Sequence, residues 1–492
     1  MRTGTKERSI MLGEAQVKQM LGEYNPWWYS EHYAETTPEV RRRAYHETLD
    51  ILMNEEVRRF VVLSGARRIG KTTVMRQVIS HLLQQGVNPL HILYLSFDNP
   101  MCKLIGVPRV LAEYESMVTP GTPCYFFFDE IQYADSWSLW LKTLYDMRPN
   151  LRLVATGSAS PSLEKGASDS GVGRWRVLRM PTLTFREFCD IQRIAPPCAG
   201  EQYSPEDFCS MGNTELTQLM SRFGNMQAAW NQYIERGGFP ELLAVSSLQQ
   251  AQMLLREDVA DKVLKRDIPS LFDVRNSLEL EKVFLYLCLH SGSLINMAEM
   301  CKKLEGVTLP TLQRYIQYLA DANLVYICHN SAYTGKKGLS AQSKIYVADV
   351  ALRNACLMMS PARMNDTEMG AMVESIVYKH LRHSFGGTHR LGYVQLKGRK
   401  KQEVDFALTR PTGEHYLCEV KYRNDSSISR EDAIAQLCNA PECLGSLLLT
   451  RNAGDYGVSP LAEDCKPITR IPAAAFCYLL SNSAQQYNES IF

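Results

Sequence analysis

The glycine-rich stretch from Gly65 to Thr72 limits what this chain can fold into more than any other, because it fits the phosphate-binding pattern GxxxxGK[ST] at every fixed position. The apolar run Phe60–Leu63 before it predicts a buried parallel strand. The apolar spacing from Thr73 to Leu83 after it predicts a helix that ends near Gly86. A strand, a glycine loop and a helix in this order direct backbone N–H groups and a helix N-terminus toward phosphate groups. The sequence therefore predicts a nucleotide site.

The residues of this loop have distinct expected roles in binding ATP. Lys71 would reach the β and γ phosphates, and Thr72 would hold Mg²⁺ through its hydroxyl. The residues expected to contact the nucleotide are Gly65, Ala66, Arg67, Arg68, Ile69, Gly70, Lys71, Thr72 and Thr73.

The length of 492 residues exceeds what a single hydrophobic core usually supports, so we expect two to four domains. The 45% of hydrophobic and 22% of charged residues are typical of a soluble globular protein, and the net charge of +1 argues against a uniformly basic nucleic-acid coat. The 14 cysteines form no CxxC pair, which favours buried thiols in a reducing compartment. Because no signal peptide or membrane-length apolar run is recognisable, the sequence predicts a cytoplasmic protein without a membrane partner.

An apolar strand that ends in two acidic residues follows the loop. This strand is predicted at Tyr125–Phe128, after another at His91–Phe97, and it runs directly into Asp129 and Glu130. Behind a phosphate-binding loop, such a pair places one carboxylate near the Mg²⁺ ion and the next near the attacking water. We therefore expect Asp129 to bind the metal and Glu130 to act as the catalytic base.

A further strand is predicted at Leu151–Ala155, and Thr156-Gly157-Ser158 follows it directly. Ligand sites in open parallel sheets lie at the carboxyl ends of the strands. Either Thr156 or Ser158 would therefore orient the water or sense the γ phosphate. A simple polar turn is the alternative.

The segment from Phe60 to Leu243 resembles a prokaryotic branch of the AAA-type P-loop ATPases, whose C-terminal half is largely unassigned in function. The resemblance implies ATP binding, ATP hydrolysis, and a nucleotide-driven change of shape or assembly, such as a homo-oligomer. Arg174 falls where such proteins offer an arginine to phosphate, in cis or to a neighbouring subunit, and a loop salt bridge is the alternative. The matching segments are Gly65–Thr72, Phe128–Gln132, Thr156–Ala159, Gly173-Arg174, Pro181–Phe188 and Gly237–Glu241.

Two of these segments also predict local structure. Thr184–Glu187 fits a capping box at the start of a helix, and Gly237-Gly238 fits a helix end followed by a turn. Between them, Ala195–Asn213 is rich in Pro, Gly, Ser and Glu, which predicts an insertion or an exposed loop.

Short helices follow in the middle of the chain. They are predicted at 280–289, 297–304 and 311–322, with an apolar strand at 324–328, which suggests a winged helix-turn-helix. Lys336-Lys337-Gly338 would then form a wing tip near phosphate. Such domains also serve as interdomain or protein-binding modules, so DNA contact is one of two alternatives. The residues that would face DNA are Thr311, Gln313, Arg314 and Gln317.

The last third of the chain predicts a helix followed by a β-hairpin. The helix spans Thr367–His383, and the two strands span Glu403–Leu408 and Tyr416–Tyr422, with a turn at Pro411–Gly413. Another helix at 431–437 and another strand at 445–450 follow.

Four charged residues of these elements would converge. Glu419 and Lys421 share one face of a strand, because side chains repeat every two residues, and the hairpin brings Asp405 toward them. With Glu374 on the helix, this order resembles the restriction-endonuclease-like fold and its PD-(D/E)xK site, although Val404 stands where the motif has proline. The resemblance implies that Asp405 and Glu419 hold Mg²⁺, that Lys421 orients or activates the water, and that Glu374 supports the metal shell.

A basic segment, Lys397–Lys401, adjoins the hairpin and would grip a phosphate backbone. The predicted α/β chain thus has a helical lead-in at 1–59 and an AAA-type P-loop NTPase domain at 60–243. A linker with a winged helix-turn-helix at 244–340 and a restriction-endonuclease-like domain at 341–492 follow.

The preferred function is an ATP-hydrolysing, DNA-associated protein with Mg²⁺-dependent endonuclease activity in DNA processing or defence. The alternative is an ATP-switched regulatory or scaffold protein whose nuclease-like domain is catalytically inactive. The two functions share the ATP site and differ in whether Asp405, Glu419 and Lys421 bind a metal and cut.

Overall fold

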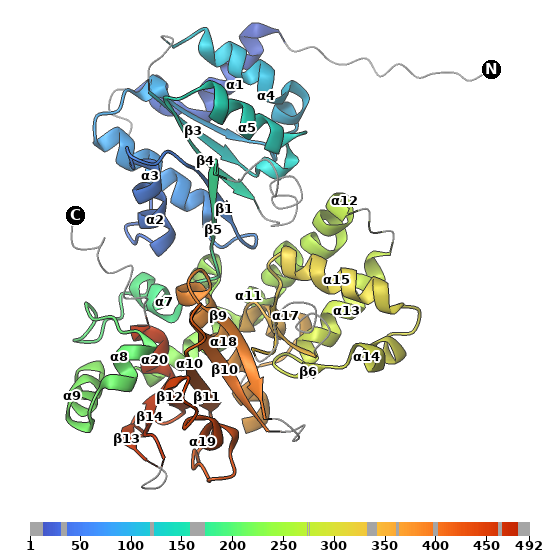
Figure 1. Ribbon diagram of the computed structural model, residues 1–492. Coiled ribbons are helices and arrows are strands. Elements are labelled where there is room, and N and C mark those ends of the chain that lie inside the picture. The colour runs from blue at the N-terminus through green and yellow to red at the C-terminus, as the bar shows by residue number, and fades with distance from the viewer. Residues whose placement is uncertain are drawn as a thin grey trace. The chain divides into compact units, whose positions relative to one another are not determined.

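The structure is a computed structural model, and it divides into two compact units (Figure 1). The first unit contains the chain up to Gly65 and Gly70–Met180, and the second contains Ala66–Ile69 and the chain from Pro181 on. Residues 181–243, which the sequence analysis placed in the ATPase domain, therefore pack within the second unit. The described residues are 13–30, 37–118, 123–157, 173–272, 274, 276–331, 342–360, 364–396, 402–460 and 465–480.

The first unit is built on a five-stranded parallel sheet with the strand order β2-β3-β4-β1-β5. The strands predicted around the glycine loop and before the two acidic residues are present. Because all five strands run in the same direction, their carboxyl ends meet at one edge of the sheet. The strands are β1 (Phe60–Ser64), β2 (Ile92–Ser96), β3 (Cys124–Asp129), β4 (Leu151–Gly157) and β5 (Trp175–Arg179).

Helices cover both faces of this sheet (Figure 1). Phe60 and Val62 of β1 pack into a core with α1, α4 and α5, whereas α2 and α3 pack against each other and against β1 or β4. Strands β1, β2 and β4 are almost wholly buried, as is the carboxyl half of β3, which explains why they read as continuous apolar runs. The helices are α1 (Glu14–Tyr24), α2 (Arg43–Leu52), α3 (Lys71–Gln84), α4 (Pro100–Glu115) and α5 (Trp137–Met147).

A six-stranded mixed sheet with the order β13-β14-β12-β11-β10-β9 forms the core of the second unit. Strands β9, β10 and β11 are antiparallel neighbours, so the predicted hairpin is present, and β11, β12 and β14 run parallel. Helices α18 (Asp366–Phe385) and α20 (Ala473–Leu479) pack on the sheet, as does α19 (Ala433–Leu437). The strands are β9 (Arg390–Gln395), β10 (Glu403–Thr409), β11 (His415–Lys421), β12 (Cys443–Thr450), β13 (Gly457–Ser459) and β14 (Ile468–Pro472).

Three helices and a small antiparallel sheet of order β6-β8-β7 precede that sheet in the chain. The predicted helices of this region are present, but the central strand β8 was not predicted. Strand β8 carries side chains from this small sheet into the neighbouring part of the unit. The elements are α13 (Ser277–Leu289), β6 (Leu294–Ile295), α14 (Met297–Lys303), α15 (Leu309–Asp321), β7 (Val325–Cys328) and β8 (Ser343–Val347).

The second unit contains further helices, most of which precede both of these sheets in the chain. The segment Ala195–Asn213, expected to be an insertion or a loop, contains helix α8, which starts with a capping box at Ser204. All fourteen cysteines lie among the described residues, and none forms a disulfide. Within the described part of the chain, no helix combines the length and the apolar character that crossing a membrane requires. The helices are α7 (Phe185–Ile191), α8 (Pro205–Ser210), α9 (Asn213–Phe223), α10 (Gln227–Arg236), α11 (Leu248–Leu255), α12 (Ile268–Phe272) and α17 (Val350–Leu357), with π-helical turns at Arg256–Asp261 and Val263–Asp267.

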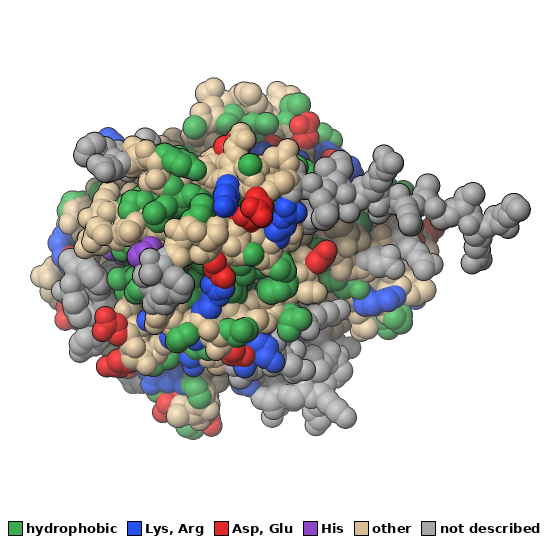
Figure 2. Space-filling model, turned by 90° about the horizontal axis from the view of Figure 1, so that it is seen from above, with side chains coloured by type: hydrophobic (Ala, Val, Ile, Leu, Met, Phe, Trp, Pro, Cys, Tyr) green, Lys and Arg blue, Asp and Glu red, His purple; other side chains and the backbone are tan. Residues whose placement is uncertain are grey.

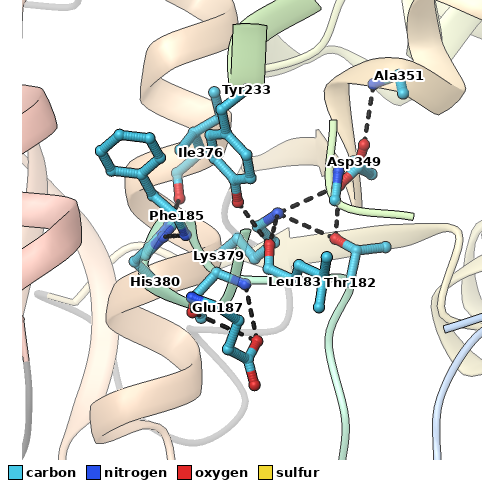
Figure 3. A network of polar contacts seen from close by, with 12 residues as sticks. Thr182, Leu183, Phe185, Glu187, Tyr233, Asp349, Ala351, Ile376, Lys379 and His380 are labelled. Atoms are coloured by element: carbon cyan, nitrogen blue, oxygen red, sulfur yellow. Dashed lines mark hydrogen bonds and ion pairs between the residues drawn. The ribbon is translucent and has the colours of Figure 1, made fainter. Parts of the chain in front are cut away.

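A fully buried ion pair explains two of the segments that the sequence analysis singled out (Figure 3). Lys379 Nζ lies 3.2 Å from Asp349 Oδ2 and also donates to Thr182 Oγ1 and to the carbonyl of Leu183, both at 3.0 Å. Asp349 in turn accepts the backbone N–H of Gly238 at 3.1 Å. The segments around Thr182 and Gly238 therefore meet at one polar contact point inside the second unit.

The predicted capping box and helix end lie next to this ion pair. Glu187 N–H donates to Thr184 Oγ1 at 3.2 Å, and Thr184 N–H donates to the Glu187 carboxylate at 2.9 Å. Gly237 ends α10 with φ +67°, and a Cβ there would overlap the carboxylate of Asp349. Both predictions are confirmed, and only glycine fits at position 237.

Candidate functional site

Lys71 lies at the start of α3, directly after the glycine loop. Gly70 precedes it with φ +94°, a left-handed conformation that glycine adopts without strain. The Lys71 side chain is buried, with 4% of the residue exposed, and its Nζ donates to the carbonyl of Gly65 at 2.9 Å. The ammonium is thus folded back over the loop, where phosphate oxygens are the ligands that it would bind.

Asp129 is the acceptor at the centre of this site. Thr72 Oγ1 donates to Asp129 Oδ2 at 2.8 Å, and Tyr94 OH donates to the same oxygen at 3.0 Å. The hydroxyl of Thr156 donates to Asp129 Oδ1. Three hydroxyl groups therefore hold the carboxylate in place at the carboxyl end of β3, and the nearby negative charge helps to raise the pKa of Tyr94, after burial.

Glu130 leaves the sheet in an unusual backbone conformation. Its φ is +51°, in the left-handed region, and its backbone N–H donates to Thr156 Oγ1 at 2.9 Å. Thr156 thus accepts from Glu130 and donates to Asp129, which fixes the two acidic residues relative to each other. The carboxylate of Glu130 accepts from Gln132 and is partly exposed. A partly exposed carboxylate with one amide partner retains room for a water molecule.

These residues fit ATP and Mg²⁺. The N-terminus of the fourteen-residue helix α3 begins at Lys71, and helix N-termini favour phosphate groups. Thr72 and Asp129 supply oxygen atoms, the ligand type that Mg²⁺ prefers. The candidate nucleotide site therefore combines Lys71, Thr72, Asp129, Glu130 and Thr156, and of these the role of Thr156 was left open by the sequence.

Among the other predicted nucleotide contacts, two arginines of the loop pair with acidic side chains, and Ser158 cannot be placed. Ala66–Ile69 pack with the second unit, where Arg67 forms an ion pair with Asp267 and Arg68 forms ion pairs with Glu241 and Asp258. Ser158 lies outside the described residues.

Arg174 contacts the carboxylate of Asp146 through two nitrogens, Nε at 2.9 Å and Nη2 at 3.1 Å. This bidentate pair lowers the pKa of Asp146. The pair matches the salt-bridge alternative stated for Arg174.

A second group of acidic residues converges in the second unit, and we refer to Glu374, Glu403, Asp405 and Glu419 as the carboxylate cluster. Glu374 comes from α18, Glu403 and Asp405 come from β10, and Glu419 comes from β11. The backbone N–H of Asp405 donates to Glu419 Oε2 at 3.4 Å. Burial and the charge of Asp405 raise the pKa of Glu374 to about 7 and that of Glu419 well above its usual range. The structure thus brings together the three carboxylates that the sequence analysis selected.

The ammonium of Lys344, from strand β8, lies inside the carboxylate cluster. Its Nζ lies 3.0 Å from Glu374, 2.8 Å from Glu403 and 3.1 Å from Asp405. Burial would lower the pKa of Lys344, but these three carboxylates outweigh it and raise the pKa, so the ammonium keeps its charge. As the side chains lie, the cluster holds an ammonium and does not form an open cage for a divalent cation. Within the described ranges, no group of three or more His, Cys, Asp or Glu residues is placed to hold a metal ion.

Lys421 is paired away from the cluster. Its Nζ lies 2.7 Å from Asp432 Oδ2 and donates to the carbonyl of Ser427 at 3.2 Å. Sequence reasoning selected Lys421 because it lies two residues after Glu419. It missed Lys344, because the only signal for that residue was the alternation of Lys344 and Tyr346 in an unrecognised strand.

The predicted DNA-facing residues lie on the exposed side of α15. Gln313, Arg314 and Gln317 are exposed, whereas Leu312, Tyr315 and Ile316 are buried. Lys336-Lys337-Gly338 and Lys397–Lys401 lie outside the described residues. On the face shown in Figure 2, basic and acidic side chains are interspersed among apolar ones, so the coloured side chains of this face do not form a basic patch.

Parts of the chain match known families. Residues 57–189 match a family described as an AAA domain. Residues 227–363 and 369–471 match two families described as domains of unknown function, DUF8612 and DUF4143. The part of the chain built on the parallel sheet is therefore similar to AAA domains, and the families that match its later parts assign no activity.

The chain is also similar to two uncharacterized proteins and to one solved structure. It is 26% identical to the uncharacterized protein MJ1544 of Methanocaldococcus jannaschii, over 80% of this chain and 81% of that protein. An uncharacterized protein of Haemophilus influenzae is 24% identical over 70% of this chain and 78% of that protein. Among solved structures, the Walker-type ATPase PABY2304 of Pyrococcus abyssi is 14% identical, covers 66% of this chain and 99% of its own, and has a TM-score of 0.40.

Proposed function

We propose that this protein hydrolyses ATP and uses the nucleotide state to control its association with DNA. The observation that carries the first part is the hydrogen-bonded set of Thr72, Asp129 and Thr156 beside the buried ammonium of Lys71. Each of these groups lies at the carboxyl end of a parallel strand or at the start of the following helix, where such sheets bind ligands.

In ATP binding, Lys71 exchanges its contact with the Gly65 carbonyl for the β and γ phosphate oxygens. Thr72 and Asp129 would hold Mg²⁺, which neutralises charge on the phosphates during transfer. Tyr94 and Thr156 keep the Asp129 carboxylate oriented, so that its geometry is fixed before the nucleotide arrives.

In hydrolysis, Glu130 orients and deprotonates the attacking water. Its carboxylate follows Asp129 directly, and the bond from its N–H to Thr156 sets the direction in which the side chain leaves the strand. The test is steady-state ATP turnover by the full chain with Mg²⁺, compared with a Glu130→Gln variant. Turnover by the wild type that is absent from this variant supports the proposal, and equal turnover would remove Glu130 from the base role.

The DNA part of the proposal rests on the elements around α15. Helices α13, α14 and α15 and the sheet β6-β8-β7 follow one another in the chain order of a winged helix-turn-helix, and α15 exposes Gln313, Arg314 and Gln317. An arginine with two amides on one exposed helix face suits contacts with phosphates and base edges. The test is binding to duplex DNA at two salt concentrations, with and without a non-hydrolysable ATP analogue.

A DNA endonuclease is the second candidate function. The convergence of Glu374, Asp405 and Glu419 from α18, β10 and β11 favours it. The test incubates the full chain with linear, forked and four-way DNA, in Mg²⁺ or Mn²⁺, with and without ATP. Cleavage that disappears with Asp405→Ala supports an endonuclease. If the wild type cuts no substrate of this panel, the C-terminal domain serves as a binding module of an ATP-switched scaffold protein.

A further inference from the structure

Strand β8 of the small antiparallel sheet contributes two side chains that contact helix α18. Lys344 and Tyr346 lie two residues apart on this strand, so their side chains leave it on the same face. Both reach Glu374 of α18: Tyr346 OH donates to Glu374 Oε1 at 2.6 Å, and Lys344 Nζ donates to the same oxygen at 3.0 Å. The small antiparallel sheet thus supplies two donors to a site otherwise built from α18 and the large sheet.

The ammonium of Lys344 is fully satisfied by carboxylates. An ammonium has three N–H donors, and Lys344 meets one carboxylate oxygen from each of Glu374, Glu403 and Asp405, at 2.8 to 3.1 Å. Its side chain is only 3% exposed. A buried charge is stable only when it is paired, so this lysine and these carboxylates depend on one another.

The same oxygens are those that a divalent cation would need. Asp405 gives Oδ1 to Lys344, and its Oδ2 accepts the backbone N–H of Val420 at 3.0 Å. Glu374 Oε1 already accepts from two donors. Mg²⁺ requires oxygen ligands at about 2.0–2.1 Å in a near-octahedral arrangement. A dication and an ammonium cannot share these oxygens, because their charges repel at such short range.

We propose that Lys344 is a tethered cation that occupies the carboxylate cluster and excludes a divalent metal ion while strand β8 is seated. The lysine supplies the positive charge that holds Glu374, Glu403 and Asp405 together. A metal ion can bind only when the Lys344 side chain leaves the cluster. The small sheet thereby controls the metal binding that the second candidate function, DNA cleavage, would require. Exclusion of the metal follows from the contacts of Lys344 with the three carboxylates and is independent of ATP hydrolysis, whereas its effect on DNA cleavage rests on the second candidate function.

The experiment measures binding of Mn²⁺ to the full chain by electron paramagnetic resonance, without nucleotide. The proteins compared are the wild type, Asp405→Asn, Lys344→Met, and Lys344→Met combined with Asp405→Asn. Lys303→Met is the control, since it removes a lysine of α14 that pairs with the exposed Glu299 instead. Any Mn²⁺ bound near Thr72 and Asp129 is common to all five proteins.

We expect the wild type, Asp405→Asn and Lys303→Met to bind Mn²⁺ equally. Lys344→Met should gain one site, at least tenfold tighter than any in the wild type, and the double variant should lose it. The proposal is overturned if Lys344→Met gains no site. It is also overturned if the wild type already holds an Mn²⁺ that Asp405→Asn removes, and this comparison decides the question should Lys344→Met fail to fold.

Discussion

Thr72 Oγ1 lies 2.8 Å from Asp129 Oδ2, which joins the first turn of α3 to the end of β3. The two residues lie far apart in the sequence and in different elements, and each carries an oxygen suited to Mg²⁺. In the proposed function, their hydrogen bond brings together the two side chains that would hold the metal ion of the ATP site.

Removing Lys71 and removing Glu130 should have separable effects on ATP. We expect Lys71→Ala to lose most nucleotide affinity, because it removes the charge that meets the β and γ phosphates. Glu130→Gln should bind ATP as the wild type does but lose about 10²- to 10⁴-fold in turnover. Calorimetry for binding and phosphate release for turnover check both. Equal ATP binding by the wild type and Lys71→Ala would contradict the assignment of the site.

Thr156 should matter for turnover more than for binding. Thr156→Val removes the donor to Asp129 and the acceptor for the Glu130 N–H. We expect turnover to fall by about 10-fold or more, since a hydrogen bond is worth about 1 kcal/mol and a factor of ten about 1.4 kcal/mol. The matched control is Thr143→Val on α5, whose hydroxyl donates to a carbonyl in its own helix. If both variants turn over ATP at the wild-type rate, Thr156 is only part of a polar turn.

Arg314 should contribute to the salt dependence of DNA binding. We expect Arg314→Ala to weaken binding to duplex DNA and to flatten the plot of log affinity against log salt by about 0.9 if one phosphate contact is lost. Arg222→Ala on α9, an exposed arginine paired with Glu201, should leave the slope unchanged. Fluorescence anisotropy at several salt concentrations provides the measurement. An unchanged slope in Arg314→Ala would favour the protein-binding alternative for this domain.

The buried pair Lys379–Asp349 should dominate the local stability of the second unit. Only 2% of the Lys379 side chain and none of the Asp349 side chain is exposed. We expect Lys379→Met to lower the free energy of unfolding by about 3–5 kcal/mol, because it leaves a buried carboxylate unpaired. Lys303→Met, which breaks an exposed pair with Glu299, should leave the free energy of unfolding almost unchanged. Chemical denaturation followed by near-UV circular dichroism compares them, and equal losses would show that the buried pair has no special weight.

His380 should make the second unit less stable in acid. Burial, and then the charge of Lys379, lower the pKa of His380 to about 3. Its Nε2 accepts the Phe185 N–H and its Nδ1 donates to the Ile376 carbonyl, as a neutral imidazole does.

A histidine in the unfolded chain has a pKa near 6.5, so it binds a proton at a pH where the buried His380 of the folded chain is still neutral. The free energy of unfolding therefore falls as the pH falls from about 6.5 toward 3. The loss from this group should approach about 1.4 kcal/mol per pH unit. Denaturation at several pH values should show a shallower decline for His380→Gln than for the wild type, with His415→Gln as the control. Parallel curves for the wild type and His380→Gln would contradict the neutral, buried state.

Local patterns predicted the elements that lie close to a motif. The strand before Gly65, the strand that ends at Asp129, and the hairpin that places Asp405 opposite Glu419 all follow from spacing within a short stretch. Such elements are predictable because a run of apolar residues and its turn residues are neighbours in the sequence.

The carboxylate cluster shows where that reasoning fails. Lys344 lies far before Asp405 in the sequence. It belongs to strand β8, which was not predicted and which follows the basic segment Lys336-Lys337-Gly338. Its position depends on the pairing of β8 with β6 and β7 and on the packing of that sheet against α18. Lys421 was predicted to lie at the site because of its spacing from Glu419. Its ammonium forms an ion pair with Asp432 instead, because the turn after β11 brings Asp432 closer. Which of two lysines enters a cluster is decided by tertiary packing.

Helix α20 lies close to the end of the described chain, yet it fills the centre of the second unit. Its Tyr478 ring packs 6.1 Å from Phe185, and the Leu479 carbonyl accepts the N–H of Tyr203. The first unit consists of residues before Pro181 and does not include Ala66–Ile69. Its sheet can therefore form while the ribosome is still making the rest of the chain. Phe185 can pack against Trp230 and Tyr233 earlier, but its contact with Tyr478 forms only when α20 emerges. A prematurely ended chain would thus present a finished ATPase sheet attached to an open core, which is the kind of surface that chaperones and proteases recognise.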